Sequence, residues 1–120
     1  AHNNPNVLSS TIGGLGGKAG IKERFGPVLA GIPKAHREKG RRQLDDFLSV
    51  TEFPGTVIDY RQWTGEFAAA SAVAAFLAAH FVKEGYIPPF QGHSQAVPLH
   101  GKGILLMGMG EFVTALEVLP

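Results

Sequence analysis

The longest run of hydrophobic positions covers residues 67–82, which carry no formal charge and read FAAASAVAAFLAAHFV. Alanine is the best helix former, so this composition predicts a helix. Thr64 is a good N-cap residue, Gly85 is a natural residue just past a helix end, and Pro88 forbids continuation. We therefore predict a helix over residues 65–84 that is apolar nearly all round and buried on most of its sides.

Shorter apolar runs on both sides of this helix predict β-strands. Residues 56–61 read as a buried strand that enters the helix, and residues 104–107 and 112–119 read as two strands joined by a tight glycine turn. Strand, long helix, strand, strand is the element order of an α/β layer. We expect one domain of 120 residues, with a mixed sheet and the alanine-rich helix packed on it.

The first half of the chain gives weaker signals. Residues 7–12 favour a short strand, residues 13–20 a glycine loop, and residues 21–30 a short helix interrupted near Pro27. The apolar positions of residues 34–50 gather late in that stretch. Its second half is therefore predicted to be an amphipathic helix.

The glycine loop invites a nucleotide-binding interpretation. Residues 14–19 fit the loose dinucleotide pattern Gly-x-Gly-x-x-Ala, whereas Ile12 and Ala19 depart from the P-loop pattern. The dinucleotide pattern is informative only between a strand and a helix, and the strand before it is doubtful. We interpret the segment as a plain flexible loop, with phosphate binding as the alternative.

Composition and charge exclude several classes of protein. The net charge of +1 gives no field that would attract nucleic acid or an anionic membrane, and the apolar run is shorter than the about 20 residues of a membrane span. There is no cysteine, and residues 1–10 lack the basic and apolar regions of a signal peptide. A cytoplasmic location is the default expectation. Low charge with 16 glycines predicts a closely packed core or a large covered surface.

Two polar groups are candidates for binding. The first is a basic cluster, which we interpret as a solvated helix face, with docking of an acidic partner as the alternative. Its members are Lys34, Arg37, Lys39, Arg41 and Arg42. The second is His93 with His100 in a predicted loop over residues 90–103, where we expect surface histidines and neither a metal site nor a cofactor.

Residues 56–119 resemble the C-terminal half of β-ketoacyl synthases, which belong to the thiolase superfamily. In those enzymes a strand ends in a lysine before a Thr-Gly-His turn. A buried Ala/Gly-rich helix, an Ile-Pro-Pro exit and a final strand pair around a Gly-Phe-Gly-Gly turn follow. This chain shows, in the same order, Arg61, Thr64-Gly65-Glu66, the alanine-rich run, Ile87-Pro88-Pro89 and Gly108-Met109-Gly110. Residues 1–50 match poorly, although Ala1-His2 is similar to the start of the family's His-Gly-Thr motif.

The resemblance implies half of a thiolase-like layered fold and a set of site residues. It places Glu66 where the family has a catalytic histidine, Arg61 where it has the supporting lysine, and His2 at the first histidine. Gly108 and Gly110 would contact substrate. The implied partners are an acyl carrier protein and its acyl thioester, with a second copy, a partner subunit or the rest of a longer polypeptide completing the fold.

Three functions remain open at this point. The first is a ketosynthase-like component of fatty acid or polyketide synthesis that is not catalytic in this chain alone, because an ionised Glu66 repels the enolate that the histidines stabilise. The second is an active acyltransferase of the superfamily, with Glu66 as general base. The third is an interaction module without acyl chemistry, in which Glu66 only complements the helix dipole.

Overall fold

A four-stranded mixed sheet forms the centre of the molecule. The computed structural model describes residues 11–65, 70–90, 93–110 and 113–120. The strand order is β2-β1-β5-β6, with β1 Phe25–Gly31, β2 Val57–Asp59, β5 Gly103–Gly108 and β6 Thr114–Val118. β1 runs parallel to β2 and β5, and β6 runs antiparallel to β5. The predicted α/β class with a mixed sheet is confirmed.

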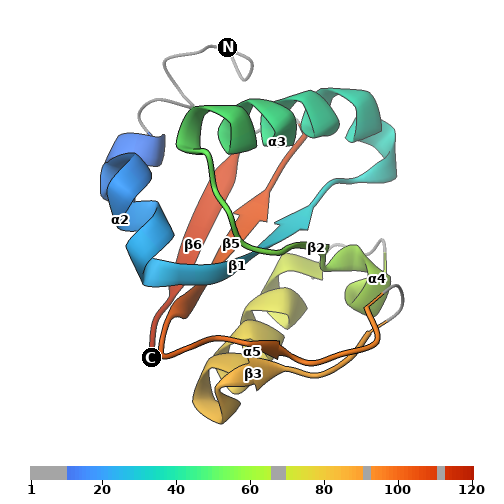
Figure 1. Ribbon diagram of the computed structural model, residues 1–120. Helices are drawn as coiled ribbons and strands as arrows, with labels where there is room; N and C mark the ends of the chain where they lie inside the picture. The colour runs from blue at the N-terminus through green and yellow to red at the C-terminus, as the bar shows by residue number, and fades with distance from the viewer. Residues whose placement is uncertain (1–10, 66–69, 91–92, 111–112) are drawn as a thin grey trace.

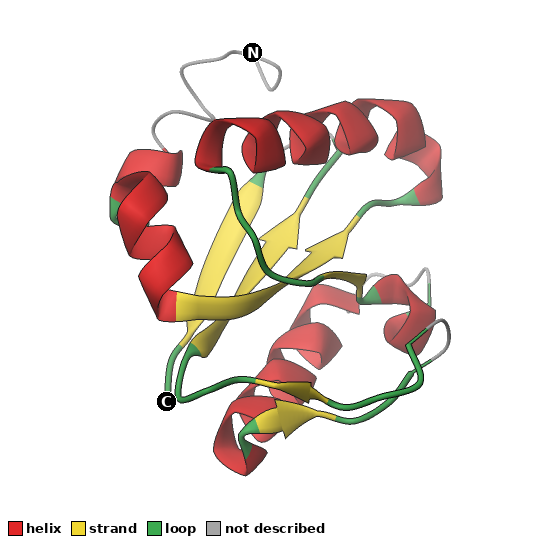
Figure 2. Cartoon of the chain, in the orientation of Figure 1, coloured by secondary structure: helices red, strands yellow, loops and turns green. Residues whose placement is uncertain are grey.

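Helices cover both faces of this sheet (Figure 1). α2 (Gly17–Arg24) and α3 (Arg37–Thr51) pack on one face, and α5 (Ala70–Glu84) packs on the other. The short helices η1 (Lys34–His36) and α4 (Arg61–Thr64) follow β1 and β2. β3 (Tyr86–Ile87) and β4 (Val97–Pro98) form a separate antiparallel pair beside α5, as Figure 2 shows.

The two central strands bury side chains on both faces. Leu29 and Leu106 belong to the core beneath α5, whereas their neighbours Val28 and Leu105 belong to the core beneath α3. Strands buried on both faces read as continuous apolar runs, which is why residues 104–107 could be recognised in the sequence. By contrast, β2 lies at the edge of the sheet and buries only Ile58. The strand predicted over residues 56–61 is therefore confirmed as a strand at residues 57–59, but there it is buried at one position only.

α5 ends as predicted, but it begins later than residue 65. Gly85 has a φ of 87° and donates its N–H to the carbonyl of Phe81 at 2.8 Å, which closes the helix. Gly65 has a φ of 76° and terminates α4, so it is not part of a long helix. Residues 66–69 lie outside the described part of the chain, and Glu66 is among them.

The prediction that this helix is buried on most sides is wrong. One face is buried, formed by Ala70, Ala74, Ala78 and Phe81 at helical spacing. The opposite face carries Val73, which is 37% exposed, and Phe76, which is 75% exposed. A single sheet covers only one side of a helix, so an all-round apolar composition leaves the other side in solvent.

The short helix predicted over residues 21–30 is confirmed at residues 21–24, which end α2, but the central strand β1 replaces it from Phe25 onward. Pro27 argued against a strand in the sequence, because proline has no N–H for a sheet ladder and is normally excluded from central strands. Here the pairing with β5 changes register between Phe25 and Val28, so Pro27 lies within an irregularity of the ladder. Regular pairing resumes at Val28, whose N–H donates to the carbonyl of Thr56 at 2.9 Å.

The glycine-rich stretch is also helical, contrary to the predicted loop. Residues 11–14 are helical and α2 follows, with Ile21 fully buried against the sheet. The predicted strand over residues 7–12 is wrong at residues 11 and 12, and its earlier part lies outside the described residues. Since a helix and not a strand precedes the glycines, the context that a dinucleotide-binding motif requires is missing.

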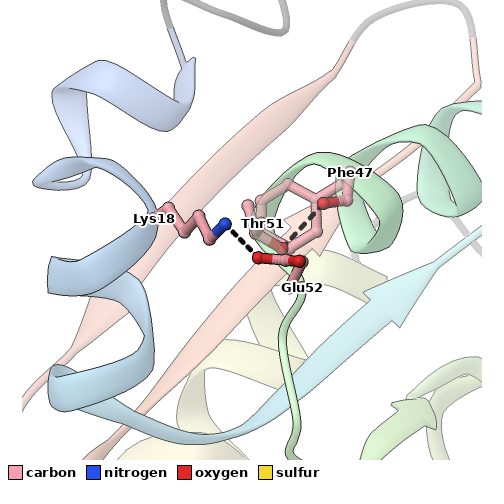
Figure 3. Close-up of polar contacts among 4 residues, drawn as sticks. All are labelled: Lys18, Phe47, Thr51 and Glu52. Atoms are coloured by element: carbon pink, nitrogen blue, oxygen red, sulfur yellow. Dashed lines mark hydrogen bonds and ion pairs between the residues drawn. The ribbon is translucent and has the colours of Figure 1, made fainter.

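Helix α3 confirms the amphipathic prediction, and it begins earlier than expected. Its buried residues follow a spacing of three or four, at Gly40, Gln43, Leu44, Phe47 and Thr51. Figure 3 shows the polar contacts at its C-terminal end. The hydroxyl of Thr51 donates to the carbonyl of Phe47 at 2.7 Å, and Glu52 forms an ion pair with Lys18 of α2.

Within the described residues, no helix is long and apolar enough to cross a membrane.

Candidate functional site

The carboxyl ends of the three parallel strands define the candidate site. Ala30 pairs with Asp59, and Gly31 pairs with Gly108, so the ends of β1, β2 and β5 meet at one edge of the sheet. The chain leaves β1 for β2 on one side and later returns to β5 on the other side. In open α/β sheets, ligands bind outside the carboxyl ends of the strands at such a switch in strand order.

Tyr60 closes the space above the end of β1. It follows β2, its N–H donates to the carbonyl of Ala30 at 3.2 Å, and its side chain is only 2% exposed. The ring lies directly over Gly31, where an added Cβ would overlap the phenol. Burial raises the pKa of Tyr60, and the positive charge of the neighbouring Arg61 opposes that rise.

Arg61 begins helix α4 at the same edge. Its N–H donates to the Asp59 carboxylate at 2.9 Å, and Gln62 donates to the carbonyl of Asp59 at 2.8 Å. Asp59 therefore fixes the start of α4, which carries the Arg61 side chain beside Tyr60. The structure thus places Arg61 at the same edge as Gly108, and the roles that the resemblance implies for both residues stay predictions.

The turn after β5 is tied to its neighbours through main-chain groups. Met109 donates its N–H to the carbonyl of Gly31 at 2.9 Å. Gly110 donates its N–H to Gln43 Oε1 at 2.8 Å, and its carbonyl accepts from Gln43 Nε2 at 3.0 Å. Gly110 has a φ of 124°, a conformation that favours glycine. Both polar main-chain groups of Gly110 are therefore engaged by α3, and its contact with substrate stays a prediction.

A shallow hollow of about 290 Å³ lies next to these groups on the α5 side of the sheet. Tyr60 forms one wall together with Leu106 and Gly108 of β5, and the other lining residues come from α5 and β6. None of the described residues that line it carries a charge. The hollow opens onto the exposed face of α5, and Leu116 of β6, which is 48% exposed, extends the apolar surface around it.

A second hollow of about 300 Å³ opens between α3 and the edge strand β2. Arg37 and Arg41 of the basic cluster lie on its wall, together with Asp45 and Asp59. Arg41 Nε is 3.8 Å from the Asp45 carboxylate, one helical turn away. The charges at this hollow are therefore mixed, and both interpretations of the basic cluster, a solvated face and a dock for an acidic partner, stay predictions.

Several of the expected site residues cannot be placed. His2 and Glu66 lie outside the described residues, so the proposed pairing of Glu66 with Arg61 stays a prediction. His93 stacks against Phe90 with 5.1 Å between ring centroids, and His100 is exposed. Among the described residues, no three histidine or acidic side chains gather closely enough to hold a metal ion.

Tyr60 and Gln43 are the site residues that the sequence prediction missed. Gln43 had a detectable signal, because it occupies the apolar stripe of an amphipathic helix, where a polar side chain needs a buried partner. The partner itself, the Gly110 main chain, is 67 residues away and could not be identified from the pattern. Tyr60 sits next to Arg61, but its position over Gly31 depends on the pairing of β2 with β1.

Comparison with protein-family models, curated proteins and solved structures found no match for this chain. Its function has to be inferred from its own residues and their geometry.

Proposed function

We propose that this chain is a β-ketoacyl synthase-like component of the machinery that condenses acyl chains in fatty acid or polyketide synthesis, and that it is not catalytic by itself. The observation that carries the proposal is the order of its motifs: Arg61, Thr64-Gly65-Glu66, the alanine-rich helix, Ile87-Pro88-Pro89 and Gly108-Met109-Gly110. Support also comes from the closing antiparallel pair β5–β6 and from α5 packed on the sheet. The thiolase-like layering is part of this proposal.

The chemistry of the site residues supports a non-catalytic role. Decarboxylative condensation needs a cysteine to carry the acyl chain and donors that stabilise the enolate formed when carbon dioxide leaves. This chain has no cysteine. Glu66 stands at the position of a donor, and its carboxylate would repel the developing negative charge. Arg61, beside Tyr60 at the strand end, would help to keep that carboxylate ionised.

Incubation with malonyl and acyl thioesters of an acyl carrier protein tests the chemical part of the proposal. We expect no acyl adduct in the intact mass of the chain and no release of carbon dioxide above the rate without protein. A stoichiometric adduct, or decarboxylation that is lost in Glu66→Gln, would overturn the proposal in favour of an active acyltransferase.

Binding of the carrier protein tests whether the chain belongs to this machinery at all. The exposed basic cluster offers the contact surface, so Arg41→Gln with Arg42→Gln should weaken binding about fivefold, with less effect at high salt. Lys83→Gln on α5 is the matched control and should leave affinity unchanged, since Lys83 lies on the opposite side of the sheet. Fluorescence anisotropy with a labelled acyl carrier protein measures both. No saturable binding by the unaltered chain would refute membership.

A further inference from the structure

A third hollow lies at the opposite edge of the sheet from the candidate site. It has a volume of about 320 Å³ and opens at the amino ends of β1, β2 and β5. Phe25, Phe53 and Leu99 provide much of its apolar lining. Three side chains that can carry positive charge also line it, namely Lys22, His100 and Lys102. None of the described residues that line it is acidic.

The two lysines of this hollow are held without a carboxylate partner. Lys102 is half-buried, and its ammonium donates to the main-chain carbonyl of Lys22 at 3.1 Å, which is a neutral acceptor. Among the described residues, neither lysine takes part in an ion pair. The charge of Lys22 acts on Glu52, but the pKa of Glu52 is lowered mainly by its hydrogen bond with Lys18, which is the residue that pairs with it. A half-buried ammonium that is not neutralised favours an anion beside it.

The backbone around the hollow is irregular and closely packed. β1 changes register between Phe25 and Val28, and Gly26 within that irregularity lines the hollow. Gly55 lines it from the β2 side, and a Cβ at Gly55 would overlap the carbonyl of Gly26. His100 adopts a φ of 52°, which is uncommon for a residue other than glycine. Irregular strands and unusual backbone conformations gather next to binding sites.

We propose that this hollow binds a small organic anion with a phosphate or carboxylate head and a flat apolar body. The ammonium groups of Lys22 and Lys102 donate to the oxygens of the head, with His100 at the rim. The body lies against Phe53, which is half-buried at the wall of the hollow. This inference does not depend on the proposed role in acyl condensation, because the hollow uses none of the residues of that site.

Titration of the ¹⁵N-labelled chain with phenyl phosphate, followed by amide chemical shifts, tests the proposal. We expect saturable shifts at Gly26, Gly55 and His100, a weaker response to inorganic phosphate, and none to benzyl alcohol, which lacks the charge. Lys22→Met should weaken binding about tenfold, the value for one charge-assisted hydrogen bond. Lys83→Met, an exposed lysine on α5, is the matched control and should bind as the unaltered chain does.

Four results would overturn the proposal. They are the absence of saturable shifts, an equal response to benzyl alcohol, an equal affinity for inorganic phosphate, and unchanged affinity in Lys22→Met. Lys102→Met should weaken binding as well, but it also removes the hydrogen bond to the Lys22 carbonyl and can lower stability. Lys22→Met keeps that carbonyl, so it is the deciding variant.

Discussion

Replacing Gly31 with alanine probes the contact that closes the candidate site. The added Cβ would overlap Cζ and the hydroxyl of Tyr60 and would lie 2.6 Å from Cε2, so the ring or the strand has to move. Gly31 pairs with Gly108 within the sheet, and its φ angle lies outside the left-handed region. The cost of placing alanine there therefore comes from steric overlap and not from backbone strain. Overpacking of a core costs about 1–3 kcal/mol. Expelling the ring instead would forfeit about 1.5–3 kcal/mol of burial, so either response predicts a loss near 2 kcal/mol.

A double-mutant cycle separates this contact from other effects. Tyr60→Leu removes the atoms that the new methyl group meets, so Gly31→Ala in that background should cost less than about 1 kcal/mol. The coupling energy should therefore be about 1–2 kcal/mol, within the range for residues in contact. Urea unfolding at one fixed protein concentration, with equal slopes for all variants, gives the free energies.

The control for this cycle is a glycine without close neighbours. Gly14 is helical, and a Cβ there would meet nothing within 4 Å, so Gly14→Ala should be neutral or stabilise by about 0.5–1 kcal/mol. If Gly31→Ala costs the same with Tyr60 as with Leu at position 60, the ring does not lie over the strand end and the description of the site is wrong.

Three further predictions concern other parts of the molecule. The exposed apolar face of α5 should be covered by a second copy or another partner, so the chain alone should self-associate at micromolar concentration in sedimentation velocity. Phe76→Asp should weaken this association without unfolding the chain. A well-folded wild-type monomer would contradict the prediction. Gln43→Leu should cost about 2 kcal/mol in urea unfolding, because the buried N–H and carbonyl of Gly110 lose their partner. Burial raises the pKa of Tyr60, so the stability that its neutral hydroxyl contributes is complete below about pH 10 and is lost as pH rises through the folded-state pKa. Tyr60→Phe should abolish this dependence of stability on pH. An unchanged pH profile in that variant would refute the prediction.

The second half of the fold was predictable because its local signals agree. Helix composition, the glycine at the end of α5 and the two apolar strands around a glycine turn all point to the observed elements. The first half was not, because tertiary contacts override its local signals. Gly17 and Gly20 are poor helix formers, yet both lie in α2, because burial of Ile21 against the sheet outweighs their low helix propensity.

The candidate site shows a similar division. The order of motifs was enough to predict that Arg61 and Gly108 lie at the ends of strands. That these strand ends share one edge of the sheet comes from the parallel pairing of β1 with β2 and β5, which was not predicted from the sequence. The contacts that shape the site were out of reach. They join Gln43 to Gly110 across 67 residues and place Tyr60 over Gly31 through strand register. Register and long-range pairing are properties of the folded sheet, and a pattern along the chain does not contain them.

The two helix layers differ in a way that bears on assembly. The outer face of α3 is polar, with Arg41, Asp45 and Asp46 exposed, as expected for a layer that faces water. On α5, the outer face instead carries Val73 and Phe76, although alanine or charged residues would favour the helix equally well or better. Helix formation therefore does not explain these apolar side chains. A covering surface, which stays a prediction, would explain them, because burial of a single phenylalanine contributes about 1.5–3 kcal/mol, a large share of a small domain's stability. The hollow beside Tyr60 and Gly108 is lined by other residues of the same helix, Ser71, Ala72 and Ala75, so a partner that covered α5 and reached these residues would also complete the walls of the candidate site.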